Sequence, residues 1–216
     1  MALDLSVYGI VDQTAAPMPV DELWPALARA GLGLVQYRDK HATTGKMVQA
    51  AGRMVAAAKA AGIPVLINDR IDVALATGAA GVHVGQEDMP VATARELLPD
   101  GAVIGLTVRS LAEAEAAPVE LLNYISIGGV FPTPTKNNPT PPLGLDGLAA
   151  VVRRLQGRRA DLPLCAIAGI DHHAVGGVMS AGVDGVAVVR AVFAAPDPVQ
   201  AVRALRIAVN ASTKFS

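Results

Sequence analysis

The sequence predicts an α/β protein, a single (β/α)8 TIM barrel that spans residues 1–216 as one domain. Two observations favour this fold. Short apolar segments alternate with longer amphipathic ones through eight repeats, and polar residues directly follow several of the short segments. The length of 216 residues fits a compact barrel, whose lower size limit is about 200 residues. A doubly wound open sheet is the alternative, since it has the same periodicity, but no Gly-x-Gly-x-x-Gly follows the first strand.

The expected strands are short, apolar on both faces and often bounded by glycine or proline, as is typical of buried parallel strands. They are Val7–Val11, Leu32–Tyr37, Pro64–Ile67, Gly81–Val84, Val103–Leu106, Tyr124–Ile127, Leu164–Ala166 and Gly185–Val188. In a parallel barrel the carboxyl ends of the strands meet at one mouth, so the polar residues that follow them should gather there.

Amphipathic segments between the strands predict helices. In residues 148–155, leucines and valines recur at spacings of three and four residues. Ser110 and Glu113 have the spacing of a capping box at the start of the fifth helix. Asp171 is expected to be the N-cap of the seventh helix. The last helix is expected to run from about Pro198 to Val209.

Two segments are expected to lie outside these regular elements. Residues 128–144 contain five prolines and the pair Asn137-Asn138. A loop of this length in a compact fold is usually functional, so we expect it to be a lid over the mouth of the barrel. Residues 210–216 are expected to form a flexible tail.

The composition argues against several classes of protein. Hydrophobic residues make up 52% of the chain and charged residues 17%, enough for a sizeable core. A net charge of −1 without a basic cluster disfavours a general nucleic-acid-binding surface. No apolar stretch approaches the roughly 20 residues that cross a bilayer, no signal peptide is visible, and one cysteine excludes an intramolecular disulfide. We therefore expect a cytoplasmic protein with small-molecule partners; its outer helices leave a homo-oligomer open.

Two acidic residues suggest a metal site. Asp69 and Asp88 lie just after the third and fourth strands, which are neighbours in a barrel. Two carboxylates that converge on one mouth suit Mg²⁺, which takes few protein carboxylates and keeps positions for water and phosphate oxygens. The alternative is that each aspartate caps the helix that follows it.

Cations and hydrogen-bonding groups follow other strands. Arg38, Lys40 and Lys136 could together neutralise a diphosphate group. Gly169 follows the seventh strand, where a glycine lets backbone N–H groups approach a phosphate. His83 is expected to be a hydrogen-bonded strand histidine rather than a general base. The neutral side chains that could orient a heteroaromatic ring are Gln36, Asn68 and Thr107.

Six segments, in this order, resemble the thiamine-phosphate synthase family, and the likeness extends from about Tyr8 to Pro198. The segments are Tyr8–Asp12, Gln36–Lys40, Ile67–Arg70, Gly81–Asp88, Gly128–Lys136 and Ala166–Ile170. Each includes or follows the end of an expected strand. No single segment is specific, whereas six in order form a specific signal.

The resemblance implies a barrel enzyme that joins 4-amino-2-methyl-5-(diphosphomethyl)pyrimidine to 4-methyl-5-(2-phosphoethyl)thiazole, or to its carboxylated form. The products would be thiamine phosphate and diphosphate. It further implies one Mg²⁺ per subunit, held by Asp69 and Asp88. The pyrimidine diphosphate would be bound by Gln36, Tyr37, Arg38, Asp39, Lys40, Asn68, Thr107 and Lys136. The thiazole phosphate would be bound by Thr133, Pro134, Thr135, Gly169, Val189 and Arg190.

The residue types suit a dissociative reaction, in which the leaving group matters more than a strong base. Arg38, Lys40 and Lys136 would be catalytic through the positive field that they place around the departing diphosphate. A closed lid would keep water away from the pyrimidinylmethyl cation.

Three positions depart from the family pattern. Thr107 stands where the family commonly has serine, and Ala168 replaces the first glycine of a Gly-Gly-Ile sequence. Arg190 replaces a serine that helps to hold the thiazole phosphate. We expect Arg190 to bind that phosphate through a charged, bidentate contact. The alternative is that Arg190 points to solvent or to a neighbouring subunit.

Three other functions are alternatives to the synthase. A thiazole tautomerase relies on a histidine at the position of Gly129, which disfavours this reading. A non-catalytic barrel that binds thiamine phosphates would be expected to lack a metal-binding acid or Lys136, and both are present. A sugar-phosphate isomerase needs a placed glutamate base, and neither Glu87 nor Glu96 has a supporting pattern.

Overall fold

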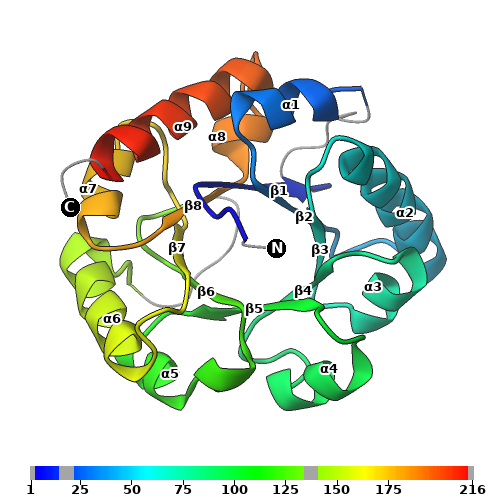
Figure 1. Ribbon diagram of the computed structural model, residues 1–216. Coiled ribbons are helices and arrows are strands. Elements are labelled where there is room, and N and C mark those ends of the chain that lie inside the picture. The colour runs from blue at the N-terminus through cyan, green and yellow to red at the C-terminus, as the bar shows by residue number, and fades with distance from the viewer. Residues whose placement is uncertain (1–2, 15–21, 134–140, 214–216) are drawn as a thin grey trace.

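The computed structural model describes residues 3–14, 22–133 and 141–213. Eight parallel strands close into a barrel in sequence order, which confirms the predicted (β/α)8 fold (Figure 1). Three of the predicted strands have the observed bounds, and the other five differ by one or two residues at one or both ends. The strands are β1 (Val7–Asp12), β2 (Leu34–Arg38), β3 (Val65–Asn68), β4 (Gly81–Val84), β5 (Val103–Val108), β6 (Tyr124–Ile127), β7 (Leu164–Ile167) and β8 (Gly185–Val188).

Helices surround the barrel as an outer ring (Figure 1). They are α1 (Trp24–Ala30), α2 (Thr44–Ala60), α3 (Ile71–Thr77), α4 (Val91–Leu97), α5 (Leu111–Ala116), the 3-10 turn η1 (Val119–Leu121), α6 (Gly144–Arg158), α7 (Val175–Ser180), α8 (Arg190–Phe193) and α9 (Pro198–Thr213). None of the helices in the described ranges is long and apolar enough to cross a membrane.

The predicted capping box at α5 is present, because the Glu113 N–H donates to Ser110 Oγ at 3.1 Å. Two other helix-end predictions were wrong. Asp171 Oδ1 accepts from the N–H groups of His173 and Ala174, but these belong to a turn, and α7 begins only at Val175. The last helix continues to Thr213, so residues 210–213 are helical rather than part of a tail. Alanine and serine in this stretch favour continuation because neither forces a break.

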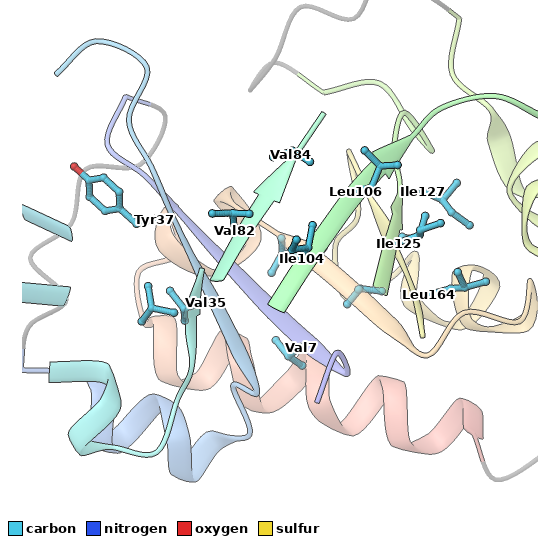
Figure 2. Packing of buried hydrophobic residues seen from close by; sticks show 14 of the residues in the cluster. Val7, Val35, Tyr37, Val82, Val84, Ile104, Leu106, Ile125, Ile127 and Leu164 are labelled. Carbon is cyan, nitrogen blue, oxygen red and sulfur yellow. The ribbon is translucent and has the colours of Figure 1, made fainter. Parts of the chain in front are cut away.

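Strand alternation divides the buried side chains into two sets. Side chains on the outer face of the strands pack against the helices, including Val35, Val82, Ile104 and Ile125 (Figure 2). Side chains on the inner face fill the lumen; among them are Tyr8, Leu34, Leu66, Tyr124 and Cys165. Because successive residues of a strand point to opposite faces, the parity of a position decides whether its side chain reaches the lumen.

One glycine makes room for the largest group of the lumen. A Cβ at Gly105 of β5 would overlap the ring of Tyr124, which enters from the adjacent strand β6. Tyr124 is fully buried as a result, with its hydroxyl inside the barrel. The close approach of a backbone to a large ring is a common reason for glycine within a strand.

The described ends of the segment predicted to be a lid are tied to the barrel. The Phe131 N–H donates to the carbonyl of Ala168 at 3.0 Å, and the Leu143 N–H donates to the carbonyl of Gly129 at 2.8 Å. The segment therefore leaves the fold beside the end of β7, and its far end returns to pair with its own first residues, just after β6. Residues 134–140 lie outside the described ranges, so a lid remains a prediction.

Candidate active site

A cavity of about 440 Å³ opens at the carboxyl ends of the strands. Its walls come from strand ends and from the loops that follow them, which is where barrel enzymes place their catalytic groups. The predicted site residues that line it are Gln36, Arg38, Asn68, Thr107, Thr133, Gly169, Val189 and Arg190. Groups predicted to contact two different substrates therefore share one cavity.

Arg38 is held in the cavity wall by a buried carboxylate. Strand register pairs Arg38 of β2 with Asp12 of β1, and the two side chains form an ion pair. Asp12 is only 1% exposed, and its other oxygen accepts from the N–H of Thr14 at 2.9 Å. A buried carboxylate with two donors has a fixed position, so it fixes the direction of the guanidinium group.

Asp69, Asp88 and Lys40 form a charged cluster next to the cavity wall at Asn68. The Lys40 ammonium forms an ion pair with Asp69. Burial raises the pKa of Asp69 above its usual value, and the neighbouring Asp88 raises it further, against the opposing effect of Lys40. The two acids are therefore close enough to repel each other, as the sequence predicted for a shared site.

Neither aspartate caps the following helix. The N-cap residues of α3 and α4 are Arg70 and Pro90, and neither helix receives a side-chain cap. Asp69 has a φ of 63°, a left-handed conformation that is uncommon outside glycine, asparagine and aspartate. Asp88 accepts from the N–H of Gly85 at 2.8 Å, within the loop after β4. The capping alternative is therefore wrong for both residues.

The cluster fits Mg²⁺ better than a metal that is held entirely by protein. Within the described ranges, no group of three or more histidine, cysteine, aspartate or glutamate residues could hold a metal. Asp69 and Asp88 together offer two mutually repelling carboxylates. Such a pair suits a hard cation that completes its shell with water and phosphate oxygens.

A chain of hydrogen bonds crosses the lumen beneath the cavity. It joins Gln36 to Tyr8, Tyr8 to Tyr124, Tyr124 to His83, and His83 to Thr107. Burial raises the pKa of both phenols well above the ordinary value, so both remain protonated. Both ring nitrogens of His83 have partners, which agrees with the prediction of a hydrogen-bonded strand histidine.

The opposite side of the cavity has the features of a phosphate site. Gly169 has a φ of 67°, and a Cβ there would lie 2.5 Å from the carbonyl oxygen of Pro132. Glycine is therefore required for this turn to pack against the loop after β6. Val189 and Arg190, at the start of α8, line the same end of the cavity.

Some predicted site residues are not brought to this cavity. The Tyr37 side chain lies on the outer face of β2 and packs in the core toward the helices (Figure 2). Asp39 Oδ1 accepts from the N–H groups of His41 and Ala42, so it shapes the loop before α2. Pro134, Thr135 and Lys136 lie outside the described ranges.

The structure also reveals residues that the sequence analysis missed. Tyr8, Asp12 and Arg109 line the cavity, and Tyr124 supports it from below. Strand parity could have found them, because Tyr8 and Asp12 share the inner face of β1 with each other, and Arg109 continues the inner face of β5 through Thr107.

Comparisons with known proteins agree with this site. A family model described as thiamine monophosphate synthase matches residues 7–192. A thiamine-phosphate synthase from Agrobacterium fabrum is 43% identical over 98% of this chain and 97% of its own. One from Chloroflexus aurantiacus is 44% identical over 83% of this chain and 81% of its own.

The agreement extends to solved structures. A thiamine phosphate pyrophosphorylase from Pyrococcus furiosus has a TM-score of 0.83 and 33% identity, and the match covers 98% of both chains. The two relatives cover most of this chain, and the family model includes every residue that lines the cavity. The chain therefore belongs to the thiamine monophosphate synthase family and is a transferase of thiamine biosynthesis.

Proposed function

We propose that this chain joins 4-amino-2-methyl-5-(diphosphomethyl)pyrimidine to 4-methyl-5-(2-phosphoethyl)thiazole, or to its carboxylated form, to give thiamine phosphate and diphosphate. Family membership supports this reaction. The observation that carries it is the shared cavity, in which Gln36, Arg38 and Asn68 face the phosphate-binding features at Gly169 and Arg190. Two substrates bound at these two ends would meet in the middle.

In this reaction the bond between the methylene carbon and the diphosphate oxygen breaks, and the oxygen keeps the electron pair. The thiazole nitrogen then donates its lone pair to the methylene carbon and forms the new C–N bond. Negative charge therefore grows on the diphosphate in the transition state. Groups that bind this charge more strongly as it grows lower the barrier.

Arg38 and Lys40 would bind that charge. Arg38 is oriented by buried Asp12, and Lys40 lies at the acidic pair. Asp69 and Asp88 would hold one Mg²⁺, which when bound supplies positive charge to the departing diphosphate. Lys136 is proposed as a third cation from the sequence alone. This scheme needs no general base. It is therefore consistent with His83, whose two ring nitrogens are both hydrogen-bonded within the lumen.

The tautomerase alternative is weaker. The structure has Gly129 with a φ of 73° where that activity is expected to need a histidine. The non-catalytic alternative is also weaker, because two acids and two basic side chains that suit diphosphate release are all present at the mouth.

The test is an assay of the purified protein with both substrates, with Mg²⁺ and with EDTA. We expect equal amounts of diphosphate and thiamine phosphate in the presence of Mg²⁺, and neither in EDTA. Tautomerisation of the thiazole without condensation would favour the tautomerase. Binding of thiamine phosphate without any turnover would favour the non-catalytic barrel and contradict the proposal.

A further inference from the structure

Arg109 is a basic residue in the cavity wall that has no part in the proposed reaction. It comes just after β5, two residues beyond Thr107, and its side chain is half-buried. Within the described ranges its guanidinium group forms no ion pair and no hydrogen bond. A cation that is partly withdrawn from water and has no partner is suited to bind an anion.

Two contacts show where the Arg109 side chain begins and where it leads. The backbone N–H of Arg109 donates to Glu113 Oε2 at 2.7 Å, at the capped start of α5. Glu113 is thereby engaged with the backbone rather than with the guanidinium group. A Cβ at Gly128 would lie 3.4 Å from Arg109 Cγ and 3.7 Å from its Nε. The side chain therefore runs alongside the backbone that follows β6.

Strand order places Arg109 between the two ends of the cavity. Asp69 and Asp88 come after β3 and β4, whereas Gly169 and Arg190 come after β7 and β8. On one side of the mouth, β5 and β6 lie between these two pairs of strands (Figure 1). A group bound to Arg109 would therefore lie between the diphosphate and the thiazole phosphate.

The charges that line the cavity leave a place for a third anion. Arg38 is paired with Asp12, and Asp171 Oδ1 accepts from two N–H groups of its own turn. Among the described residues that line the cavity, Arg109 and Arg190 are the arginines without a carboxylate partner. The thiazole phosphate is expected at Arg190, and the diphosphate is expected at residues that follow β2, β3 and β4. Neither of these anions needs Arg109.

The carboxylated thiazole carries such a third anion, and the place of the carboxylate on the ring follows from the other substituents. A thiazole ring has three carbon atoms. The methyl group occupies C4 and the phosphoethyl arm occupies C5, so a carboxylate on the ring can only be at C2. C2 is bonded to the nitrogen that attacks the methylene carbon of the pyrimidine. The carboxylate therefore lies beside the reacting atoms, between the two phosphate-bearing ends.

We propose that Arg109 binds the carboxylate of the carboxylated thiazole phosphate and thereby makes this form, rather than the uncarboxylated one, the preferred second substrate. The inference rests on the proposed function and decides between its two thiazoles. A guanidinium group suits this task because it can donate two parallel N–H bonds to a carboxylate. Because Arg109 is half-buried, water screens the ion pair less than it would at a fully exposed site.

The test measures the binding of three thiazole phosphates that differ only at C2. One carries the carboxylate, one carries a hydrogen atom, and one carries a carboxamide, which has nearly the shape of the carboxylate without its charge. Dissociation constants are measured by calorimetry in the presence of Mg²⁺ and diphosphate. Diphosphate fills its own end of the cavity, so each thiazole phosphate is confined to the other end and no turnover takes place.

We expect the wild type to bind the carboxylated thiazole roughly 10-fold more tightly than the form with hydrogen at C2, as a charged hydrogen bond allows. The carboxamide should bind within about threefold of the hydrogen form, because it has no charge. Arg109→Gln keeps an N–H donor but loses the positive charge. In this variant the carboxylated and hydrogen forms should bind within about threefold of each other.

Arg190→Gln is the matched control, because Arg190 also lines the cavity and also has no partner among the described residues. All three ligands carry the phosphate expected at Arg190, so this variant should weaken them by a similar factor and keep the preference for the carboxylate. If Arg109→Gln instead weakened all three equally, Arg109 would bind the phosphate and the proposal would be wrong. Weaker binding of diphosphate alone to Arg109→Gln would assign Arg109 to the leaving group and would also contradict the proposal.

The proposed function and the role of Arg109 can fail separately. A wild type that binds the carboxylated and hydrogen forms equally would overturn the role of Arg109, as would a carboxamide that binds as tightly as the carboxylate. Both results come from the wild type, so they stand even if a variant does not fold. Failure to form thiamine phosphate from either thiazole would overturn the proposed function, while the binding constants would still decide the role of Arg109.

Discussion

The ammonium group of Lys40, after β2, forms an ion pair with the carboxylate of Asp69, after β3. Even with this partner, the pKa of Asp69 stays above its ordinary value, because Asp69 is buried and Asp88 lies nearby. A basic residue proposed for substrate binding and an acid proposed for metal binding thus belong to one electrostatic cluster. A divalent cation there would relieve the remaining repulsion.

We expect Asp88→Asn to raise the melting temperature in EDTA and to abolish the stabilisation that Mg²⁺ gives the wild type. Asparagine can still accept from the N–H of Gly85, so the loop after β4 should keep its shape. Activity should fall about 100-fold or more, since charge stabilisation of the leaving group is lost. Melting curves with and without Mg²⁺, together with the coupled assay, measure both effects.

The pH dependence gives this prediction a sign. When the pKa of an acid is higher in the folded protein than in the unfolded chain, the protein loses stability as pH rises. The loss begins at the unfolded pKa of about 3.9 and is complete above the folded pKa. Removing Asp88 should lessen that loss at Asp69. The gain in melting temperature in EDTA should thus be larger at about pH 7 than at about pH 4. A gain that shrinks as pH rises would contradict the repulsion.

Asp12→Asn tests whether Asp12 positions Arg38. The variant keeps an acceptor but loses the charge of the ion pair. We expect KM for the pyrimidine diphosphate to rise about 10-fold, because outer partners of a site typically contribute 10- to 100-fold. KM for the thiazole phosphate should change little.

Asp4→Asn is the control for this pair. Asp4 forms an ion pair with Arg206 of α9. Because Asp4 precedes β1, this pair lies at the amino ends of the strands, opposite to the cavity. Losing that ion pair should affect stability without changing either KM. If both variants altered the kinetics equally, the effect of Asp12 would be one of general stability rather than of positioning.

Ala168→Gly tests the strain at the end of β7. Ala168 has a φ of 96°, a region that L-residues other than glycine rarely adopt. We expect the free energy of unfolding to rise by about 1 kcal/mol, as the left-handed conformation costs alanine roughly 1–2 kcal/mol. Ala166→Gly, at a fully buried position within β7, should instead lower it by about 1 kcal/mol. Chemical denaturation measures the free energy of unfolding of both variants. If both substitutions lowered it equally, Ala168 would not be strained.

Arg190→Ser tests the unusual arginine at the phosphate end of the cavity. Arg190 is exposed but lines the cavity at the start of α8. We expect KM for the thiazole phosphate to rise about 10-fold, the effect of losing a charged hydrogen bond, with KM for the pyrimidine nearly unchanged. Arg203→Ser on α9, an exposed arginine that does not line the cavity, is the control. Wild-type kinetics for Arg190→Ser would place Arg190 in solvent.

Much of the fold was predictable because strand and helix periods differ. Gly81–Val84, Tyr124–Ile127 and Gly185–Val188 were predicted with the observed bounds. Flanking glycines or polar residues mark these ends in the sequence. The end of α9 was predicted at Val209 but lies at Thr213, because residues 210–213 contain no glycine or proline that would break the helix.

The site was predictable at the level of strand ends but not of strand faces. Gln36 and Arg38 line the cavity, whereas Tyr37 between them does not, because alternation turns its side chain toward the helices. The chain of hydrogen bonds that joins Gln36 to Thr107 through the lumen was missed for a different reason. Its members come from five strands, and which side chains meet across the lumen depends on barrel closure and on the space left at Gly105.

The central claim is that Asp69 and Asp88 hold the metal to which diphosphate binds. Anomalous diffraction from crystals grown with Mn²⁺ and diphosphate tests it most directly. We expect one peak per subunit between the carboxylates of Asp69 and Asp88, with diphosphate oxygens on its open side toward Arg38. A peak elsewhere, or diphosphate bound far from both aspartates, would contradict the account.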